Sequence, residues 1–310
     1  MAHPAGSAWT ELGPGIRARR SEVFRMNSVL LAHPEHAVVV DPGVLPSELD
    51  DLAGAVAACS PAEVTLIFTH GDWDHVLGRP WWPHASTLAH DRLAAELTRN
   101  RDAILGSAVE AVASAGERWE RGFEPFRPGV EVSGLHFTRL GPWRLVLRNA
   151  FGHSPSMLSA HLPEHRLLIA GDMLSDIEIP MLQQPCEVYR RTLLELAPLA
   201  ENGAIETLIP GHGSITRGRG EALARIRRDL GYLEELERRV RAARAEGLTL
   251  EQTQDRLDAM DYPGRQAAYS MQPSHRENVR LVYLEPAAEP PGSRSRARRP
   301  RSRRPPRGHP

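Results

Sequence analysis

Four segments of this chain share one design, in which a short apolar run ends in a small polar loop that carries histidine or aspartate. Runs of this length bounded by turn residues are typical of buried strands. A glycine beside the polar residue lets the backbone turn sharply where the strand ends. Because strand ends can meet at one edge of neighbouring sheets, we expect an α/β protein in which these loops form a single site. The segments are "VTLIFTHGDWDH" (64–75), "RLVLRNAFGHS" (144–154), "RLLIAGD" (166–172) and "ETLIPGHG" (206–213).

The remaining sequence predicts further strands and helices around these four segments. Two strand-like runs in 23–40 flank a Pro-Glu turn and indicate a hairpin. A strand pattern covers 130–148, and a strand pair around another turn covers 156–172. Strands therefore come in two blocks, each followed by helices. The expected helices are 47–58 with Ser47 as N-cap, 91–121, 187–199, 221–244 with apolar residues at three- and four-residue steps, and 275–283.

Composition excludes several classes of function. The 310 residues are 41% hydrophobic and 25% charged, as in an ordinary soluble globular protein. We find no apolar run long enough for a transmembrane helix and no signal-peptide core, so we expect a cytoplasmic protein without a membrane partner. All 38 basic residues are arginine, which excludes a Schiff-base lysine and a Walker-type phosphate loop. The two cysteines, Cys59 and Cys186, support neither a disulfide framework nor a cysteine zinc site.

The C-terminal residues differ from the rest of the chain. Residues 286–310 hold eight arginines, one glutamate and seven prolines, and no large apolar residue. Such a segment cannot offset the entropy of ordering, so we expect a disordered, solvated tail after a domain spanning 22–285 and an N-terminal segment 1–21. The alternative is that the tail binds nucleic acid or another acidic partner, because arginine-rich tails bind phosphate.

The four loops together hold seven candidate metal ligands. A single histidine is more often structural than a ligand, and we expect this of His161 and His165, which lie near the loops. Four imidazoles and three carboxylates at strand ends are harder to explain without a metal, since both groups bind divalent cations. The candidates are His70, Asp72, Asp74, His75, His153, Asp172 and His212.

The ordered motifs resemble those of the metallo-β-lactamase-fold hydrolases. The resemblance lies in His-x-Asp-x-Asp-His from His70, "GHS", "AGDM" and "PGHG", and in the preceding "NSVLL…VVVDPG"; "HRENVRLVY" is similar to the terminal helix of the glyoxalase-II-like branch. It implies a four-layer αββα sandwich with two divalent metal ions, zinc being expected. A metal-bridging hydroxide would hydrolyse an ester, thioester, lactone or related bond of a small-molecule substrate.

The resemblance also implies a role for each candidate. His70, Asp72 and His153 would hold the first metal, and Asp74, His75 and His212 the second. Asp172 would bridge the two metals, and Asp74 and Asp172 would be the catalytic residues.

Asp72 departs from the family, in which this position is usually histidine. With three aspartates and a hydroxide the core would be neutral around two divalent cations, and its bound water less acidic. Oxygen ligation also shifts the metal preference from zinc toward iron or manganese. A carboxylate here is similar to the flavodiiron oxygen reductases, although no flavodoxin module follows. The expected function is therefore a hydrolase, and the alternatives are a non-haem iron oxidoreductase on the same site or a noncatalytic binding protein.

Substrate class is only partly constrained. Trp73, Trp81 and Trp82 are expected to pack in the core, or alternatively to form an aromatic wall beside the cleft. Segment 91–130 would then cover this cleft, and Arg79 and His275 could meet a substrate anion. The absence of lysine disfavours the glutathione thioester of glyoxalase II. The oligomeric state is not readable from the sequence.

Overall fold

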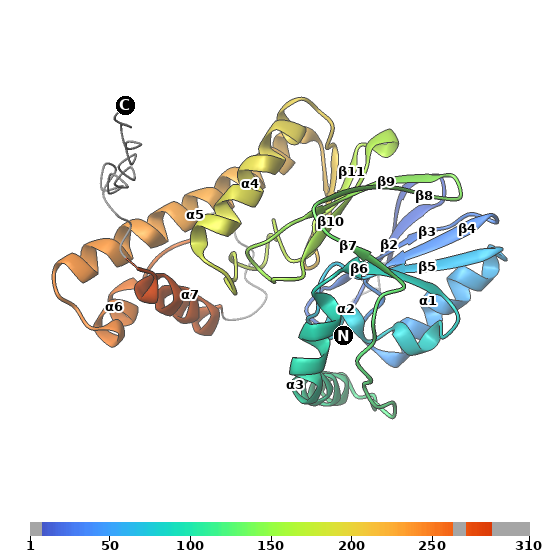
Figure 1. Ribbon diagram of the computed structural model, residues 1–310, viewed down its shortest axis with the longest axis horizontal. Helices are drawn as coiled ribbons and strands as arrows, with labels where there is room; N and C mark the ends of the chain where they lie inside the picture. The colour runs from blue at the N-terminus through green and yellow to red at the C-terminus, as the bar shows by residue number, and fades with distance from the viewer. Residues whose placement is uncertain (1–7, 263–270, 287–310) are drawn as a thin grey trace, which may run out of the picture.

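A computed structural model describes residues 8–262 and 271–286, which form two β-sheets packed face to face with helices on both outer faces (Figure 1). One apolar cluster fills the space between the sheets and includes Val29 and Val38 from the first sheet and Leu145 and Leu158 from the second. Two further clusters join each sheet to its helices. The expected four-layer αββα sandwich is thereby confirmed.

The first sheet has seven strands in chain order. Its first four strands pair antiparallel, whereas β4 to β7 run parallel, so their carboxyl ends lie at one edge. Its strands β3 and β4 are buried along their whole length, including the polar residues Asn27, Ser28 and His36 at their starts. The strands are β1 (Trp9–Gly13), β2 (Ile16–Arg20), β3 (Asn27–Leu31), β4 (His36–Val40), β5 (Glu63–Ile67), β6 (Ser86–His90) and β7 (Val130–Val132).

The second sheet has six strands in the order β13-β12-β11-β10-β9-β8. Strand β10 is antiparallel to both β9 and β11, and β11 is parallel to β12. The chain therefore leaves β9, β11 and β12 at the same edge. The strands are β8 (Leu135–Leu140), β9 (Trp143–Asn149), β10 (Leu158–Leu162), β11 (Leu167–Ile169), β12 (Thr207–Ile209) and β13 (Thr216–Arg217).

The helices cover the two outer faces. Helices α1 and α3 pack on the first sheet, and α4 and α5 on the second. Figure 1 shows that α5 extends well beyond the sheets, with α6 and α7 beside its distal half. The helices are α1 (Pro46–Ala58), α2 (Trp73–Val76), α3 (Leu93–Ser114), α4 (Cys186–Glu201), α5 (Arg219–Ala245), α6 (Leu250–Leu257) and α7 (Gln272–Leu284), with 3-10 turns η1 (Arg79–Trp81) and η2 (Pro163–His165).

The N-terminal segment is more structured than we predicted. Residues 9–20, expected to lie outside the domain, form β1 and β2 and extend the first sheet by antiparallel pairing with β3. Asp51 of α1 also accepts hydrogen bonds from Trp9 Nε1 at 2.9 Å and Arg19 Nε at 2.7 Å. Local sequence did not reveal that these residues join the first sheet, because strand pairing is a long-range contact.

Other local predictions differ from the structure in smaller ways. Ser47 is not an N-cap: α1 begins at Pro46 after the N-cap Leu45, and Ser47 Oγ donates to Glu117 Oε1 at 2.5 Å. Strand β6 and helix α6 were not predicted. The expectations for 287–310 lie outside the described residues.

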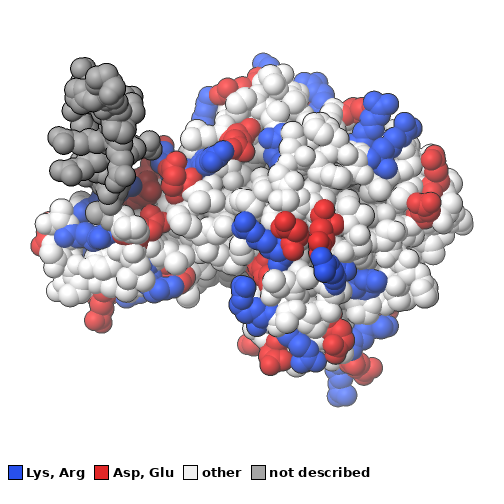
Figure 2. Space-filling view, viewed as in Figure 1, with Lys and Arg blue, Asp and Glu red and all other residues white. Residues whose placement is uncertain are grey.

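The surface carries both signs of charge. On the face shown in Figure 2, arginine and acidic side chains are interspersed, without a large patch of one sign. None of the helices in the described ranges has both the length and the apolarity needed to cross a bilayer.

Candidate metal centre

The seven candidate ligands come together where strands of both sheets end. The loop after β5 carries His70 and Asp72 and continues into α2, which holds Asp74 and His75. His153, Asp172 and His212 follow β9, β11 and β12, whose carboxyl ends share an edge. A hydrogen bond of 2.8 Å from Leu158 N to Thr69 O joins the two edges. The predicted convergence is therefore a consequence of parallel strand direction within each sheet.

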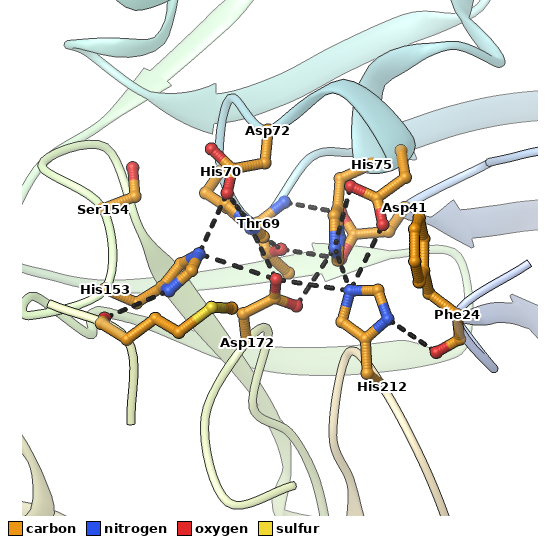
Figure 3. Close-up of polar contacts among 12 residues, drawn as sticks. Phe24, Asp41, Thr69, His70, Asp72, His75, His153, Ser154, Asp172 and His212 are labelled. Atoms are coloured by element: carbon orange, nitrogen blue, oxygen red, sulfur yellow. Dashed lines mark hydrogen bonds and ion pairs between the residues drawn. The ribbon is translucent and has the colours of Figure 1, made fainter. Parts of the chain in front are cut away.

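Asp172 lies at the centre of the cluster (Figure 3). Its Oδ2 lies 3.4 Å from His70 Nε2, 3.5 Å from His153 Nε2 and 3.3 Å from His212 Nε2. Its Oδ1 lies 3.0 Å from His75 Nε2. One carboxylate thus faces all four imidazoles, as a group shared between two cations would.

The other two aspartates divide the cluster into two halves. Asp72 Oδ2 lies 3.0 Å from His153 Nε2 and 3.6 Å from His70 Nε2. Asp74 Oδ2 lies 3.2 Å from His212 Nε2, and its Oδ1 is 3.9 Å from His75 Nε2. Each half offers three candidate ligands besides Asp172, and the ligand atoms within each group lie within 4.8 Å of one another. These are the two ligand sets that the sequence resemblance implied.

Every imidazole is held through its Nδ1 atom. His75 Nδ1 lies 3.0 Å from Asp41 Oδ2, His153 Nδ1 3.3 Å from Met181 O, and His212 Nδ1 3.0 Å from Phe24 O. His70 Nδ1 lies 3.0 Å from Thr69 Oγ1. These partners can accept a hydrogen bond from Nδ1–H, and they turn each Nε2 toward the centre. With a metal bound, the proton would stay on Nδ1 and Nε2 would be the ligand atom, as in other metal-ligating histidines.

Asp41, directly after β4, holds the loop that carries His70 and His75 and was missed from the sequence. It is 2% exposed, and its carboxylate accepts from Thr69 N at 2.7 Å, Thr69 Oγ1 at 2.6 Å and His75 Nδ1 at 3.0 Å. Since the Thr69 hydroxyl donates to Asp41, it is free to accept from His70. The signal was present, because "HAVVVDPG" is a fifth apolar run that ends in an aspartate beside a glycine turn.

Glu178 is a further carboxylate that the sequence did not single out. It is 6% exposed, and it forms a third potential metal-binding group with Asp172 and His212. It lies in the irregular segment after Asp172 rather than at a strand end, so the strand-end pattern could not identify it. Its charge adds to the negative potential on the His212 side of the centre.

Glycine is required beside the central carboxylate. A Cβ atom at Gly211 would lie 1.9 Å from Asp172 Oδ1, a distance that no side chain could accommodate. Gly171 has a φ of +61°, in the left-handed region that other residues rarely adopt. The glycines of "AGD" and "PGHG" thus allow the two loops to approach closely.

The electrostatics of the cluster fit a bound cation. Burial is the largest single effect on His70 and His212 and lowers their pKa, but the surrounding carboxylates, Asp172 foremost, together outweigh it and raise the pKa of both. Burial likewise opposes the ionised form of Asp172, but its histidine neighbours hold its pKa well below the usual range. His70 Nε2 and Asp172 Oδ1 are buried without a hydrogen-bond partner. Converging lone pairs and carboxylates with unpaired buried atoms form a donor set suited to divalent metal ions.

Residues suggested as substrate contacts behave differently from the ligands. His275 is buried, and its ring nitrogens lie 2.9 Å from Tyr232 Oη and 2.9 Å from Leu257 O, so it has a structural role. Arg79 donates to the carbonyls of Trp82 and Pro83 in its own loop. The suggestion that either meets a substrate anion has no support in these contacts.

The three tryptophans of this region lie in different environments. Trp82 belongs to the core, and Trp81 packs against Trp119 with ring centroids 5.9 Å apart. Trp73 instead forms an edge-to-face pair with Phe24 at 6.1 Å and lines a cavity that includes residues of α3. The aromatic wall is thus restricted to Trp73, with Phe24 as an unpredicted partner.

Comparison with known proteins agrees with this architecture. The family model of the metallo-beta-lactamase superfamily matches residues 22–220. An acyl-coenzyme A thioesterase, MBLAC2 of Gallus gallus, is 26% identical over 208 residues, which are 61% of this chain and 72% of the relative.

Solved structures share the fold at low sequence identity. The stereoselective inverting sec-alkylsulfatase Pisa1 from Pseudomonas sp. matches 89% of this chain with a TM-score of 0.65 and 14% identity. The match covers 49% of the sulfatase, so this chain spans about half its length. A metallo-beta-lactamase from Pontibacter korlensis matches 71% of this chain and 98% of its own, with a TM-score of 0.52 and 14% identity. The converging ligand set, the αββα sandwich and the family match over residues 22–220 together show that this protein belongs to the metallo-beta-lactamase superfamily.

Proposed function

We propose that the protein hydrolyses a thioester or ester of a small-molecule substrate at a dinuclear metal centre. The observation that carries the proposal is the position of Asp172, whose carboxylate faces two sets of three candidate ligands. The thioesterase relative favours a thioester, with lactones and related acyl bonds as further candidates. We propose zinc as the metal, with iron or manganese as alternatives.

The proposed ligand assignment follows the two halves of the cluster. One metal would be held by His70, Asp72 and His153, and the other by Asp74, His75 and His212, with Asp172 shared between them. When bound, the metals would supply Lewis-acid polarisation of the substrate and acidify a water molecule.

The residues of the chain have positioning and proton-holding roles in this proposal. The Nδ1 contacts fix each imidazole so that Nε2 faces the centre, and Asp41 aligns His75. Asp74 places Oδ2 beside His212, while its Oδ1 lies 3.9 Å from His75 and can accept a proton from an incoming water. Asp74 and Asp172 are therefore the proposed catalytic residues.

Asp72 favours a second candidate, a non-haem iron oxidoreductase on the same ligand set. Its carboxylate lies against His153 and His70, where it would provide a hard oxygen ligand. Elemental analysis of protein purified from its native host separates the candidates. Two irons per chain with oxygen consumption and no hydrolysis would refute the hydrolase.

The hydrolase is tested with acyl thioesters, aryl esters and lactones, and with Asp172→Ala beside wild type. We expect the variant to lose at least one metal and its turnover, because among the described residues only the Asp172 carboxylate faces both halves of the cluster. Asp102→Asn is the control, since this carboxylate is 93% exposed on α3. An Asp172→Ala protein that retained two metals and full activity would contradict the assignment.

A further inference from the structure

A cavity of about 550 Å³ lies beside the metal centre. Two of its lining residues adjoin the ligands. Trp73 lies between Asp72 and Asp74 in the sequence. The carbonyl oxygen of Phe24 lies 3.0 Å from His212 Nδ1 (Figure 3). The volume is within the range of small-molecule sites. None of the seven candidate ligands lines the cavity itself, so it is a separate space that adjoins the ligands through Phe24 and Trp73.

The shape of the cavity comes from small residues facing two aromatic rings. Helix α3 contributes Ser107, Ala111 and other short side chains, which leave room in front of Phe24 and Trp73. The two rings meet edge to face at 6.1 Å with an interplanar angle of 79°. Phe24 is 43% exposed and has a φ of +50°, a backbone conformation that is costly for a bulky residue. The chain thus presents an aromatic surface to the cavity at the expense of local strain.

The charge of the cavity has one sign. Glu22 and Glu110 line it, and no arginine or histidine of the described chain does so. Neither glutamate side chain takes part in an ion pair within residues 8–262 and 271–286. Aromatic faces beside unpaired carboxylates attract cations, particularly weakly hydrated alkylammonium groups, and repel anions. The anionic phosphates of an acyl-coenzyme A would therefore be disfavoured in this cavity.

We propose that this cavity binds the end group of the substrate and selects a positively charged alkylammonium group over a neutral or anionic one. The proposal rests on the hydrolase function proposed above. Two divalent metals would repel a cationic substrate group. The carboxylate of Asp72, in addition to those of Asp74 and Asp172, would reduce the net charge of the centre and so weaken this repulsion.

Kinetics with an isosteric substrate pair test the selection. The metal-loaded full chain is assayed with acetylthiocholine and with S-(3,3-dimethylbutyl) thioacetate, which has the same shape but no charge. We expect kcat/KM to favour the cationic substrate by about tenfold. The double variant Glu22→Gln/Glu110→Gln should bring this ratio close to one. Equal rates for the two substrates in wild type, or an unchanged ratio in the double variant, would overturn the selection while leaving the hydrolase intact.

Matched variants control for general effects. Glu201→Gln removes an exposed carboxylate at the end of α4, in the opposite helical layer, and should keep the wild-type ratio. Phe24→Leu should lower the ratio, whereas Phe137→Leu, on β8 and 71% exposed, should not. A fall in the ratio for all variants alike would mean that the cavity is not the source of selection.

Binding without turnover separates this proposal from the hydrolase function. Calorimetric titration of the full chain with choline and with its neutral isostere 3,3-dimethylbutan-1-ol needs no catalysis. We expect tighter binding of choline, lost in the Glu22→Gln/Glu110→Gln protein. If no thioester is hydrolysed yet choline binds in this way, the hydrolase fails and the cation site stands; if choline binds no better than the alcohol, the cation site is refuted.

Discussion

Asp41→Asn should weaken the metal site that contains His75 without unfolding the protein. Asparagine has the shape of aspartate but replaces one acceptor oxygen with an amide donor. All three contacts of the carboxylate are with donors: Thr69 N at 2.7 Å, Thr69 Oγ1 at 2.6 Å and His75 Nδ1 at 3.0 Å. In either orientation of the amide, at least one donor meets another donor, and the most adaptable response is for His75 to move its proton to Nε2.

The magnitude of this effect follows from two independent estimates. An unsatisfied buried donor costs about 1–3 kcal/mol. Loss of a hydrogen-bond partner behind a metal-ligating histidine costs about 10–100-fold in metal affinity, which is a free energy of similar size. We therefore expect the dissociation constant of the metal held by His75 to rise by about one to two orders of magnitude. The other metal should be affected less, because Asp41 reaches His70 only through Thr69.

Competition between the protein and a chromophoric chelator measures both dissociation constants. Asp102→Asn provides the matched control, since it makes the same chemical change at a carboxylate that is 93% exposed. Thermal unfolding of the metal-free proteins shows whether folding itself is altered. If folded Asp41→Asn bound both metals as tightly as wild type, the reasoning that Asp41 fixes the His75 tautomer would be refuted.

Three further predictions concern charge and metal. Asp72→His should tighten zinc binding and lower the apparent pKa for turnover, because an imidazole leaves the centre more positive; titration and a pH-rate profile check this, and no change in either would mean that Asp72 is not a ligand. Burial raises the pKa of Asp229 to about 7, so between pH ~4 and 7 the folded state binds more protons than the unfolded state and the free energy of unfolding falls as pH rises. Asp229→Asn should therefore gain stability relative to wild type from pH 5 to 8 in denaturant titrations at fixed metal concentration, whereas a pH-independent difference would contradict this. Removal of metal with a chelator should lower Tm. Metal at 100 times its dissociation constant should raise the free energy of unfolding by about 2.7 kcal/mol per site, as measured by calorimetry. A Tm that does not respond to metal would argue against a metal site in the folded protein.

The sequence was informative where function depends on local pattern. An apolar run followed by a glycine turn and a ligand-type residue occurs in one short stretch of chain, so the four loops and the seven candidates could be read directly. Parallel strands leave a sheet at one edge, which is why the predicted residues converge in the structure. Their role as ligands stays a prediction that the metal and variant experiments test.

Features that depend on long-range packing were not predictable in the same way. Strand β2 pairs with β3 and β1 pairs with β2, which adds both strands to the first sheet. No local pattern in residues 1–21 predicts this pairing. His275 looked available for a substrate, but packing against Tyr232 and the Leu257 carbonyl uses both of its ring nitrogens. Glu178 reaches the centre from an irregular segment that has no periodicity.

The sequence by itself therefore determined the order of the ligand loops and the unusual carboxylate at Asp72, because each is encoded by residues close together in the chain, and the resemblance of these motifs to a known family implied the sandwich. Only the tertiary structure decided that Asp41 holds the loop of His70 and His75, and that Phe24, Trp73, Glu22 and Glu110 line one cavity. These residues come from separate elements, and their proximity is set by strand pairing and by the packing of α3 against the metal-binding loop, which are properties of the whole fold.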